Sequence, residues 1–307
     1  MNAHAFNCIT SVAPSVAHIM GFEPPKTAGA ANRALLELQQ KALGGRKATR
    51  ALLYNPDAIA HYLFARYTDD FLPVLRHAPL ALPMQSVMPS VTPVCFASMY
   101  TGALPEVHGI RAYVKPVLTA DTLFDAALRA GLRPAIVSTA GDSISKIFLE
   151  RAMDYFIYDT IDEVNDKAAQ LIEADEHDIL VVYNGDYDAT MHRFSPESRE
   201  ALSAMRGNVA VFDRLCTLAS KHWAAHDTLV AFAPDHGCHP IDGGLGSHGL
   251  DMPEDMLIPH FSGFLPRTKY RPRTTKPAVK PRFAAGFSQC PDAIISNGRQ
   301  SGDLSHH

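Results

Sequence analysis

Three short apolar stretches of this chain each end in acidic residues, and this repeated pattern constrains its fold more than any other feature. "ALLYNPD" ends at Asp57, "ILVVYNGDYD" at Asp186 and Asp188, and "LVAFAPDH" at Asp235 and His236. Short continuous apolar runs are typical of strands buried on both faces of a sheet. Because the carboxyl ends of parallel strands share one sheet edge, where open α/β folds bind ligands, we expect these side chains to converge.

The same alternation of strand and helix patterns runs from residue 49 onward. Strands are expected over 49–55, 80–88, 133–139, 154–159, 178–184 and 228–234. Helices are expected over 58–78, from 92 to the Thr-Gly at 101–102, and over 121–131, 142–152, 161–175 and 195–223. Strands that alternate with amphipathic helices predict an α/β fold with crossover connections between parallel strands.

The composition suits one folded domain followed by a different kind of segment. Of the 307 residues, 47% are hydrophobic and 20% charged, which is ordinary for a globular chain. Beyond Leu265 the sequence becomes basic and proline-rich without an apolar period. We therefore expect a single catalytic domain over 1–265 and a disordered tail over 266–307. A nucleic-acid or membrane arm is the alternative for the tail, but charge runs are usually solvated.

Net charge and cysteine spacing exclude several classes of protein. A net charge of −4 gives no bias toward nucleic acid or membranes, and we expect neither as a partner. The N-terminal stretch lacks the basic start and apolar run of a signal peptide, so we expect a cytoplasmic protein. No CxxC pair is present, which argues against a disulfide framework or a zinc finger. The cysteines are Cys8, Cys95, Cys216, Cys238 and Cys290.

Acidic residues and histidines recur together at spacings that suit metal binding. Asp188 and His192 stand four residues apart, so on a helix they would share one face. Asp235 and His236 are adjacent at a strand end, and the glycine-rich "GGLGSHG" supplies His248. Carboxylate oxygens with imidazole nitrogens favour zinc, with manganese or iron as alternatives. The set is large enough for two ions.

Each of these residues also has a simpler interpretation. An Asp at a strand end commonly caps the next helix, and this would account for Asp57 or Asp188 taken singly. Likewise, Thr92 before Pro93 would by default be a helix cap, and His248 before Gly249 a loop residue. Capping does not explain why acid and imidazole recur at the same sheet edge, so the joint pattern favours a metal site.

The stretch "MPSVTPVCFASMYTGALPEVHG" places Thr92 beside that edge. We expect Thr92 to be the N-cap of a helix whose first turn contains Pro93. A hydroxyl there lies at the positive end of the helix dipole, beside free N–H groups that can hold an oxyanion. If a divalent metal contacts this oxygen, the hydroxyl loses its proton more readily and becomes a nucleophile.

Four separated motifs resemble the alkaline phosphatase superfamily in its type I phosphodiesterase/nucleotide pyrophosphatase branch. "PSVTPVCFASMYTGALPEVHGI" is similar to that branch's nucleophile segment and "YNGDYDATMH" to its Asp-x-x-x-His metal segment. "APDHG" is similar to its Asp-His-Gly, and "GSHG" to the segment of its last histidine. The resemblance runs from about Leu52 to Pro259, in the family's order.

This resemblance implies a fold, a cofactor and a reaction. The fold would be a three-layer α/β sandwich with a mainly parallel, mixed sheet flanked by helices. Two divalent ions, Zn²⁺ or alternatively Mn²⁺, would be bound. One would be held by Asp57, Asp235, His236 and the Thr92 oxygen, and the other by Asp188, His192 and His248. Thr92 would attack phosphorus to form a phosphothreonine, making the protein a two-metal-dependent hydrolase of small-molecule phosphate esters or phosphonates.

The chain departs from the family pattern in three places. Cys95 stands where relatives often carry an Asn three residues after the nucleophile, which leaves the substrate class open. Ala58 follows Asp57 where Gly is usual, so Asp57 is the least secure ligand. Residues 9–29 resemble a segment that the superfamily usually carries near its C-terminus. They predict either a circular permutation, with 9–29 packed on the core, or an ordinary N-terminal helix after Pro14.

Several functions remain open on the sequence alone. A phosphomonoesterase, a phosphonate hydrolase or a phosphomutase of the same superfamily are the alternatives, and a monoesterase would need basic groups such as Arg111 and Lys115. Sulfate ester hydrolysis is less favoured, because sulfatases want Cys or Ser at position 92 followed by Pro-x-Arg. A non-catalytic metal-binding protein on an inherited fold is the alternative of another class. Cys238 and His239 are expected to pack beside the site.

Overall fold

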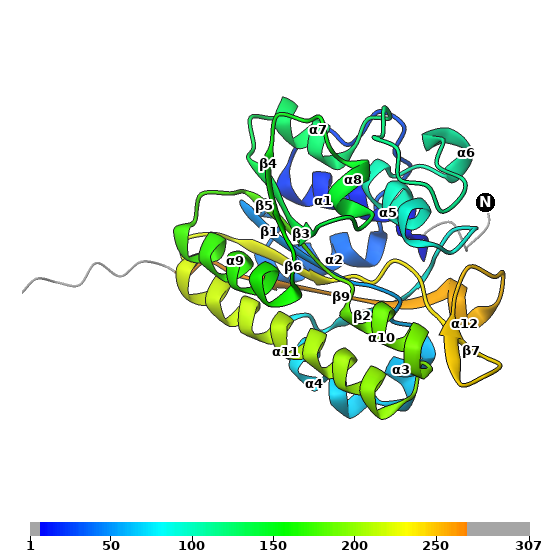
Figure 1. Ribbon diagram of the computed structural model, residues 1–307. Helices are drawn as coiled ribbons and strands as arrows, with labels where there is room; N and C mark the ends of the chain where they lie inside the picture. The colour runs from blue at the N-terminus through cyan, green and yellow to red at the C-terminus, as the bar shows by residue number, and fades with distance from the viewer. Residues whose placement is uncertain (1–6, 269–307) are drawn as a thin grey trace, which may run out of the picture. The chain divides into compact units, whose positions relative to one another are not determined.

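The computed structural model describes residues 7–268, and within them a seven-stranded sheet forms the centre of the fold (Figure 1). The strand order is β2-β9-β6-β1-β5-β3-β4. Strand β9 runs opposite to the other six strands, because it pairs antiparallel with both β2 and β6. The strands are β1 (Arg50–Pro56), β2 (Leu80–Gln85), β3 (Pro134–Thr139), β4 (Asp154–Tyr158), β5 (Ile179–Asn184), β6 (Thr228–Phe232) and β9 (Leu257–Leu265).

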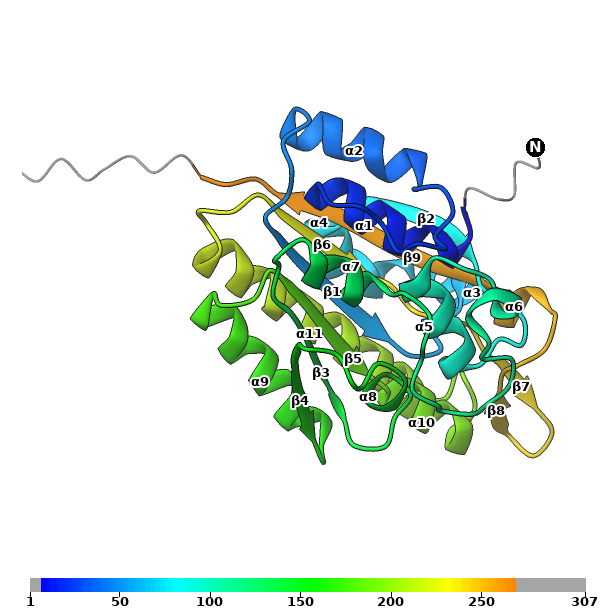
Figure 2. The same ribbon diagram turned by 90° about the horizontal axis from the view of Figure 1, so that it is seen from above.

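Helices cover both faces of the sheet and give three layers, which confirms the predicted fold class (Figure 2). One face carries α1 (Val12–Met20), α2 (Arg33–Leu43), α5 (Thr92–Thr101), α7 (Leu123–Arg129) and α8 (Ile144–Ile147). The other carries α3 (His61–Arg66), α4 (Leu72–His77), α9 (Ile161–Ala174), α10 (Asp186–Phe194) and α11 (Arg199–His222). Shorter elements are η2 (Ile9–Ser11), η3 (Thr68–Phe71), α6 (Pro105–His108), α12 (Pro253–Met256) and the hairpin β7 (His239–Ile241) with β8 (Leu245–Ser247).

The central strands are apolar on both sides because helices cover both sides. Along β1, Leu52 and Tyr54 pack into one hydrophobic core, whereas Ala51 and Leu53 pack into the other. The same division holds along β5 and β6. The sheet therefore separates two cores and leaves its carboxyl edge to polar residues.

Three predicted helices differ from the observed ones. The segment 58–78 is broken into α3, η3 and α4, with Pro73 in the first turn of α4, because proline starts a helix more readily than it continues one. The helix predicted over 195–223 begins at Arg199, capped by the Ser198 hydroxyl, which accepts from the Ala201 amide. Ser195 instead ends α10 with a φ of 75°.

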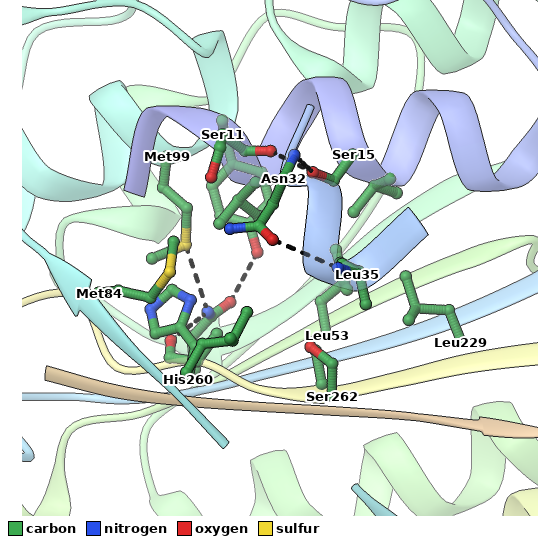
Figure 3. Close-up of a pocket in the computed structure, with 17 residues that line it drawn as sticks. Ser11, Ser15, Asn32, Leu35, Leu53, Met84, Met99, Leu229, His260 and Ser262 are labelled. Atoms are coloured by element: carbon green, nitrogen blue, oxygen red, sulfur yellow. Dashed lines mark hydrogen bonds between the residues drawn. The ribbon is translucent and has the colours of Figure 1, made fainter. Parts of the chain in front are cut away.

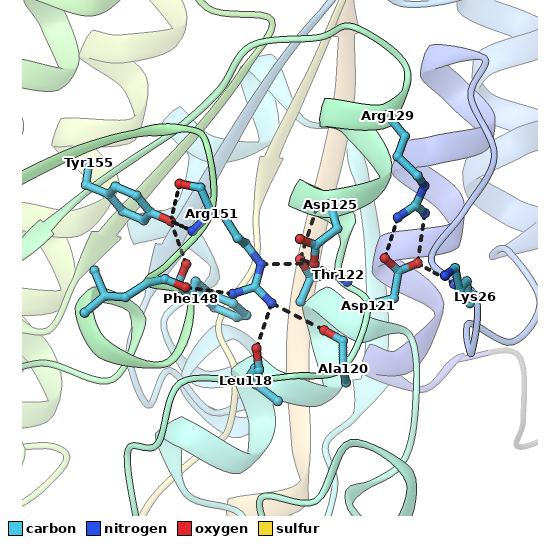
Figure 4. Close-up of polar contacts among 11 residues, drawn as sticks. Lys26, Leu118, Ala120, Asp121, Thr122, Asp125, Arg129, Phe148, Arg151 and Tyr155 are labelled. Atoms are coloured by element: carbon cyan, nitrogen blue, oxygen red, sulfur yellow. Dashed lines mark hydrogen bonds and ion pairs between the residues drawn. The ribbon is translucent and has the colours of Figure 1, made fainter.

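The helix predicted over 142–152 is reduced to α8 by the contacts of Arg151 (Figure 4). The Arg151 guanidinium is only 7% exposed and lies 3.0 Å from Asp125 Oδ2. It also donates to the carbonyls of Leu149, Leu118 and Ala120. Only the Leu149 carbonyl belongs to the predicted helix, and its bond to Arg151 accompanies a turn in which Glu150 has a φ of 65°.

Strand β9 was not predicted, and its sequence explains why. "LIPHFSGFL" contains Pro259 and Gly263, which are both poor strand formers. Gly263 is needed here, since a Cβ at this position would lie 2.0 Å from the His77 carbonyl oxygen. The close approach of α4 to the sheet therefore selects a residue that hides the strand pattern.

The N-terminal segment packs on the core, as the permutation hypothesis requires. Helix α1 contacts α5, and the Gly29 amide donates to the Gly102 carbonyl at 3.1 Å. A cavity of about 40 Å³ remains between α1, α2 and the sheet, and His260 and Ser262 lie along its wall (Figure 3). The permutation itself stays a prediction.

Other predictions concern the ends of the chain and its cysteines. The tail predicted over 266–307 lies outside the described residues except for 266–268. There, the Arg267 amide donates to Asp227 Oδ1 at 3.0 Å. Within the described part, Cys8, Cys95, Cys216 and Cys238 are free thiols. No helix over residues 7–268 combines the length and apolar character needed to cross a bilayer.

Candidate metal centre

Six predicted ligands form two clusters at the carboxyl edge of the sheet. In each cluster, one potential ligand atom from every residue lies within 4.8 Å of the others. One cluster is Asp57, Asp235 and His236, and the other is Asp188, His192 and His248. The structure therefore brings together the residues in the same two sets that the sequence predicted.

The three central strands place most of these side chains. Asp57 follows β1, Asp235 follows β6, and Asp188 and His192 lie four residues apart on α10, which follows β5. The Asp57 amide donates to the Asn184 carbonyl at 3.0 Å, so the sheet ladder continues past the end of β1 and fixes its turn. The remaining ligand, His248, comes from the loop that follows β8.

Each histidine of the site is oriented by a backbone carbonyl. The Nδ1 atoms of His192, His236 and His248 lie 2.9, 2.9 and 3.0 Å from the carbonyl oxygens of Gly246, Gly237 and Ser90. Since a carbonyl can only accept, each Nδ1 carries a proton, so it is Nε2 that can turn a lone pair toward the cluster. Partners of this kind commonly fix the tautomer of metal-ligating histidines.

The Nε2 atoms face carboxylate oxygens that have no hydrogen bond. His236 Nε2 lies 3.3 Å from Asp57 Oδ1 and 3.4 Å from Asp235 Oδ2. In the other cluster, Asp188 Oδ1 lies 3.3 Å from His192 Nε2 and 3.5 Å from that of His248.

Among residues 7–268, these three carboxylate oxygens are buried without a hydrogen-bond partner. An unpaired buried carboxylate is costly, and two lone pairs repel each other. A divalent cation between them would satisfy both, so the donor set fits the implied ions.

Burial works against charge at this site. It raises the pKa of Asp57 and of Asp235, and the neighbouring carboxylates add to both shifts. Burial also lowers the pKa of His248 to about 3, with a further contribution from His236. The pKa of His192 is raised by its contact with Asp188. A bound cation would offset the cost of ionising the carboxylates.

The Thr92 hydroxyl lies at the first cluster. Its Oγ1 is 3.3 Å from His236 Nε2 and 3.4 Å from Asp57 Oδ2. The prediction that Thr92 is the N-cap was wrong by one residue, because Val91 is the cap and Thr92 begins α5. The backbone of Thr92 is therefore already helical, and its hydroxyl does not accept a hydrogen bond from an amide of the first turn.

Fewer backbone amides are free beside Thr92 than the sequence predicted. The amides of Val94 and Cys95 both donate to the Val91 carbonyl at 3.0 Å, and Pro93 has no N–H group. This first turn is tight because the capping carbonyl accepts both bonds. The two amides are consequently used inside the helix rather than for an oxyanion.

The sequence analysis missed Tyr183, which directly contacts the site. Its hydroxyl donates to Asp57 Oδ2, the oxygen that the Thr92 hydroxyl also approaches. The signal was available, since Tyr183 lies in β5, the strand paired with β1, close to the end that carries the ligands. A tyrosine in an otherwise aliphatic buried strand needs a partner for its hydroxyl.

Two residues that depart from the family pattern, Ala58 and Cys95, lie next to the site. Of the two, Ala58 has a strained backbone. Ala58 adopts a φ of 62°, the left-handed region that favours glycine, and Asp57 is nevertheless in place. Cys95 lies 3.1 Å from the Ser86 hydroxyl, and burial raises the pKa of its thiol. The Ser86 hydroxyl donates to the Asp235 carbonyl at 2.7 Å. Cys95 thus packs behind the strand end that carries Asp235.

Residues 58–139, which include Thr92 and the whole of α5, match the family described as Type I phosphodiesterase / nucleotide pyrophosphatase. Over these residues the chain is similar to that family. The resemblance drawn from the motifs is therefore confirmed. No match is found among curated proteins.

Solved structures of low sequence identity are similar in fold to this chain. Murine ectonucleotide pyrophosphatase/phosphodiesterase 5, as an inactive variant in complex with AMP, matches with a TM-score of 0.51 and 16% identity. This match covers 64% of the present chain and 59% of the murine one. The human protein of the same name gives a TM-score of 0.51 and 16% identity over 63% of this chain and 58% of its own. Phosphonoacetate hydrolase from Sinorhizobium meliloti, in complex with phosphonoformate, has a TM-score of 0.46 and 22% identity, covering 64% and 59% of the two chains.

Proposed function

We propose that this chain is a two-metal-dependent phosphoric ester hydrolase that acts through a phosphothreonine on Thr92. One observation carries the proposal. Three unpaired buried carboxylate oxygens face three oriented imidazole nitrogens, and the Thr92 hydroxyl lies beside one of these clusters. The family match over residues 58–139 and the shared fold support the same conclusion. Zn²⁺ is the proposed ion, with Mn²⁺ as the alternative.

The reaction follows from the positions of the protein groups. Divalent ions, when bound, would supply positive charge that lowers the pKa of the Thr92 hydroxyl and neutralises phosphoryl oxygens. The Thr92 oxygen forms a bond to phosphorus as the bond to the leaving alcohol breaks, and that alcohol takes up a proton. Water then cleaves the phosphothreonine, returning the hydroxyl and releasing the second product. Helix α5 holds the Thr92 oxygen in place throughout.

A diester is the favoured substrate within this class. A monoester carries an additional negative charge, which would call for further basic groups at the phosphate. Arg111 and Lys115 already donate to the backbone carbonyls of Glu106 and Gly141. Met88, four residues before Thr92, and Leu250, two after His248, are exposed apolar side chains that suit an ester group without charge.

The proposal is tested with metal-stripped protein reloaded with zinc or manganese. Release of p-nitrophenol would be compared for bis-p-nitrophenyl phosphate and p-nitrophenyl phosphate, using wild type, Thr92→Ala and Thr92→Ser. We expect metal-restored turnover, faster on the diester, that Thr92→Ala abolishes without loss of bound metal.

Faster turnover of the monoester would instead identify a phosphomonoesterase. Full activity in Thr92→Ala would show that Thr92 is not the nucleophile. Two bound ions without turnover on either ester would direct the assay to phosphonates and mutase substrates. A lack of activity with all of these would support a non-catalytic metal-binding protein.

A further inference from the structure

A buried aspartate outside the ligand set, Asp255, links the two loops that carry histidine ligands. It lies on α12 and is fully buried. Its Oδ1 is 2.7 Å from His239 Nδ1, and its Oδ2 accepts from the Leu250 amide at 2.8 Å. Both oxygens are thus engaged, each by a different loop.

One of these loops continues directly from His236. The Gly237 amide donates to the Asp255 carbonyl at 2.7 Å, and His239 follows two residues later. Helix α12 approaches so closely that a Cβ at Gly237 would lie 2.0 Å from the Glu254 carbonyl oxygen. Asp255 therefore holds the His236 loop through both its backbone and its carboxylate.

The other loop continues from His248. Leu250 lies two residues after this ligand, and the bond from its amide to Asp255 fixes the backbone that follows the imidazole. The Ser90 hydroxyl also donates to the Leu250 carbonyl at 3.2 Å, while the Ser90 carbonyl lies 3.0 Å from His248 Nδ1. The orientation of His248 thus depends on backbone that Asp255 helps to hold.

Helix α12 also reaches the strand end that carries Asp235. The Met256 carbonyl accepts from the Ser86 amide at 2.8 Å, and the Ser86 hydroxyl donates to the Asp235 carbonyl. The segment around Asp255 consequently contacts the supports of ligands from both clusters.

We infer that Asp255 is a positioning residue that fixes the His236 loop and the His248 loop relative to each other, so that the two metal clusters keep one separation. This inference rests on the two-cluster site proposed above. A carboxylate suits the position because it accepts from two N–H groups at once. An asparagine could accept with its oxygen alone, and would turn an N–H₂ donor toward one of the two donors.

Zinc binding tests this inference independently of turnover. Metal-stripped wild type, Asp255→Asn and Asp255→Ala would be titrated with Zn²⁺ against a chelating indicator. We expect both zinc affinities to fall about 10–100-fold, the range for residues that orient metal ligands. In an active enzyme, kcat should fall more than KM changes, because the second cluster would no longer keep a fixed position relative to the Thr92 oxygen beside the first.

Asp227→Asn is the matched control. Asp227 is also a buried carboxylate that joins separate segments, through Arg46 and the Arg267 amide, but it precedes β6 at the opposite sheet edge. Its substitution should leave both zinc affinities unchanged.

Asp255→Asn that is folded by circular dichroism and binds both ions like wild type would overturn the inference. So would a loss confined to one ion. Should Asp255→Ala not fold, Asp255→Asn still decides the question. Should Thr92-dependent hydrolysis fail altogether, the zinc titrations remain valid by themselves.

Discussion

The imidazole rings of His236 and His248 lie 4.1 Å apart at an interplanar angle of 28°, although each belongs to a different ligand cluster. Such close rings cannot both carry a charge at low cost, and each uses Nδ1 for a backbone carbonyl. Because Nδ1 of each ring is used in this way, Nε2 of each ring is the nitrogen that can bind a neighbouring ion. The stacked pair thus brings a ligand of one cluster into contact with a ligand of the other.

Removal of one ligand should nevertheless empty only one cluster. His192 is half-buried on α10 and contacts Asp188, and its ring lies 5.1 Å from that of His248 in the same cluster. We expect His192→Ala to lower the bound zinc from two ions to one per chain, measured by elemental analysis after dialysis. His226→Ala, which removes a histidine near the opposite sheet edge, should retain both ions. Loss of both ions in His192→Ala would show that the clusters fill as one unit.

The hydroxyl of Tyr183 should affect metal binding through Asp57. In Tyr183→Phe, Asp57 Oδ2 loses a charge-assisted hydrogen bond of about 1.5–3 kcal/mol. We expect zinc affinity to fall by about 10–100-fold. Tyr100→Phe is the matched control, because it removes a buried hydroxyl on α5 that donates to Asn55. Equal zinc affinities for the two variants in a competition titration would contradict this role.

The predicted ligands lie close together because their positions are set by topology. The positions of Asp57, Asp188 and Asp235 follow from strands β1, β5 and β6 lying side by side, and apolar runs reveal those strands. The hydrogen bonds that hold the ligands and their loops in place could not be predicted from the sequence in this way. The Tyr183 and Asp255 bonds join segments that no local pattern connects.

The fold was predicted less completely where tertiary contacts override local preference. Strand β9 contains Pro259 and Gly263, so its pattern suggests a loop, and only its neighbours β2 and β6 make it a strand. Similarly, the buried Arg151 ends a helix that its sequence would support. In both places, the deciding partner lies far away in the chain.

Acid should destabilise the turn at the end of α6, because His108 there is buried and can take up a proton. The Ile110 amide donates to His108 Nδ1 at 3.2 Å, so in the neutral ring Nε2 carries the proton and donates to the Ser98 hydroxyl. Burial lowers the pKa of His108 to about 4, from an ordinary value of about 6.5. Between these two values the unfolded chain binds a proton that the folded chain does not, so the free energy of unfolding falls as the pH falls.

We expect this loss to begin below about pH 6.5 and to level off near pH 4. His108→Gln keeps a donor for Ser98 but cannot titrate, so its stability should fall less over this range. Thermal unfolding followed at several pH values would measure the difference. Parallel curves for the two proteins would show that His108 does not contribute to the acid sensitivity.

The packing of the N-terminal segment against α5 should depend on a single glycine, Gly102, at the end of that helix. Gly102 has a φ of 71°, and a Cβ there would lie 2.6 Å from Ala28 Cβ and 3.1 Å from Pro14 Cδ. We expect Gly102→Ala to cost roughly 2–5 kcal/mol of unfolding free energy, from left-handed backbone and overpacking together. Denaturant unfolding would measure this cost.

Gly131→Ala separates the two contributions to that cost. Gly131 has a similar φ of 77°, but among the described residues, its two chain neighbours aside, no heavy atom would lie within 4 Å of an added methyl group, so only the backbone cost of about 1 kcal/mol should remain. Limited proteolysis should in addition release residues 9–29 faster from Gly102→Ala than from Gly131→Ala. Equal stability and equal cleavage in the two variants would mean that the contact between this segment and α5 contributes little to the fold.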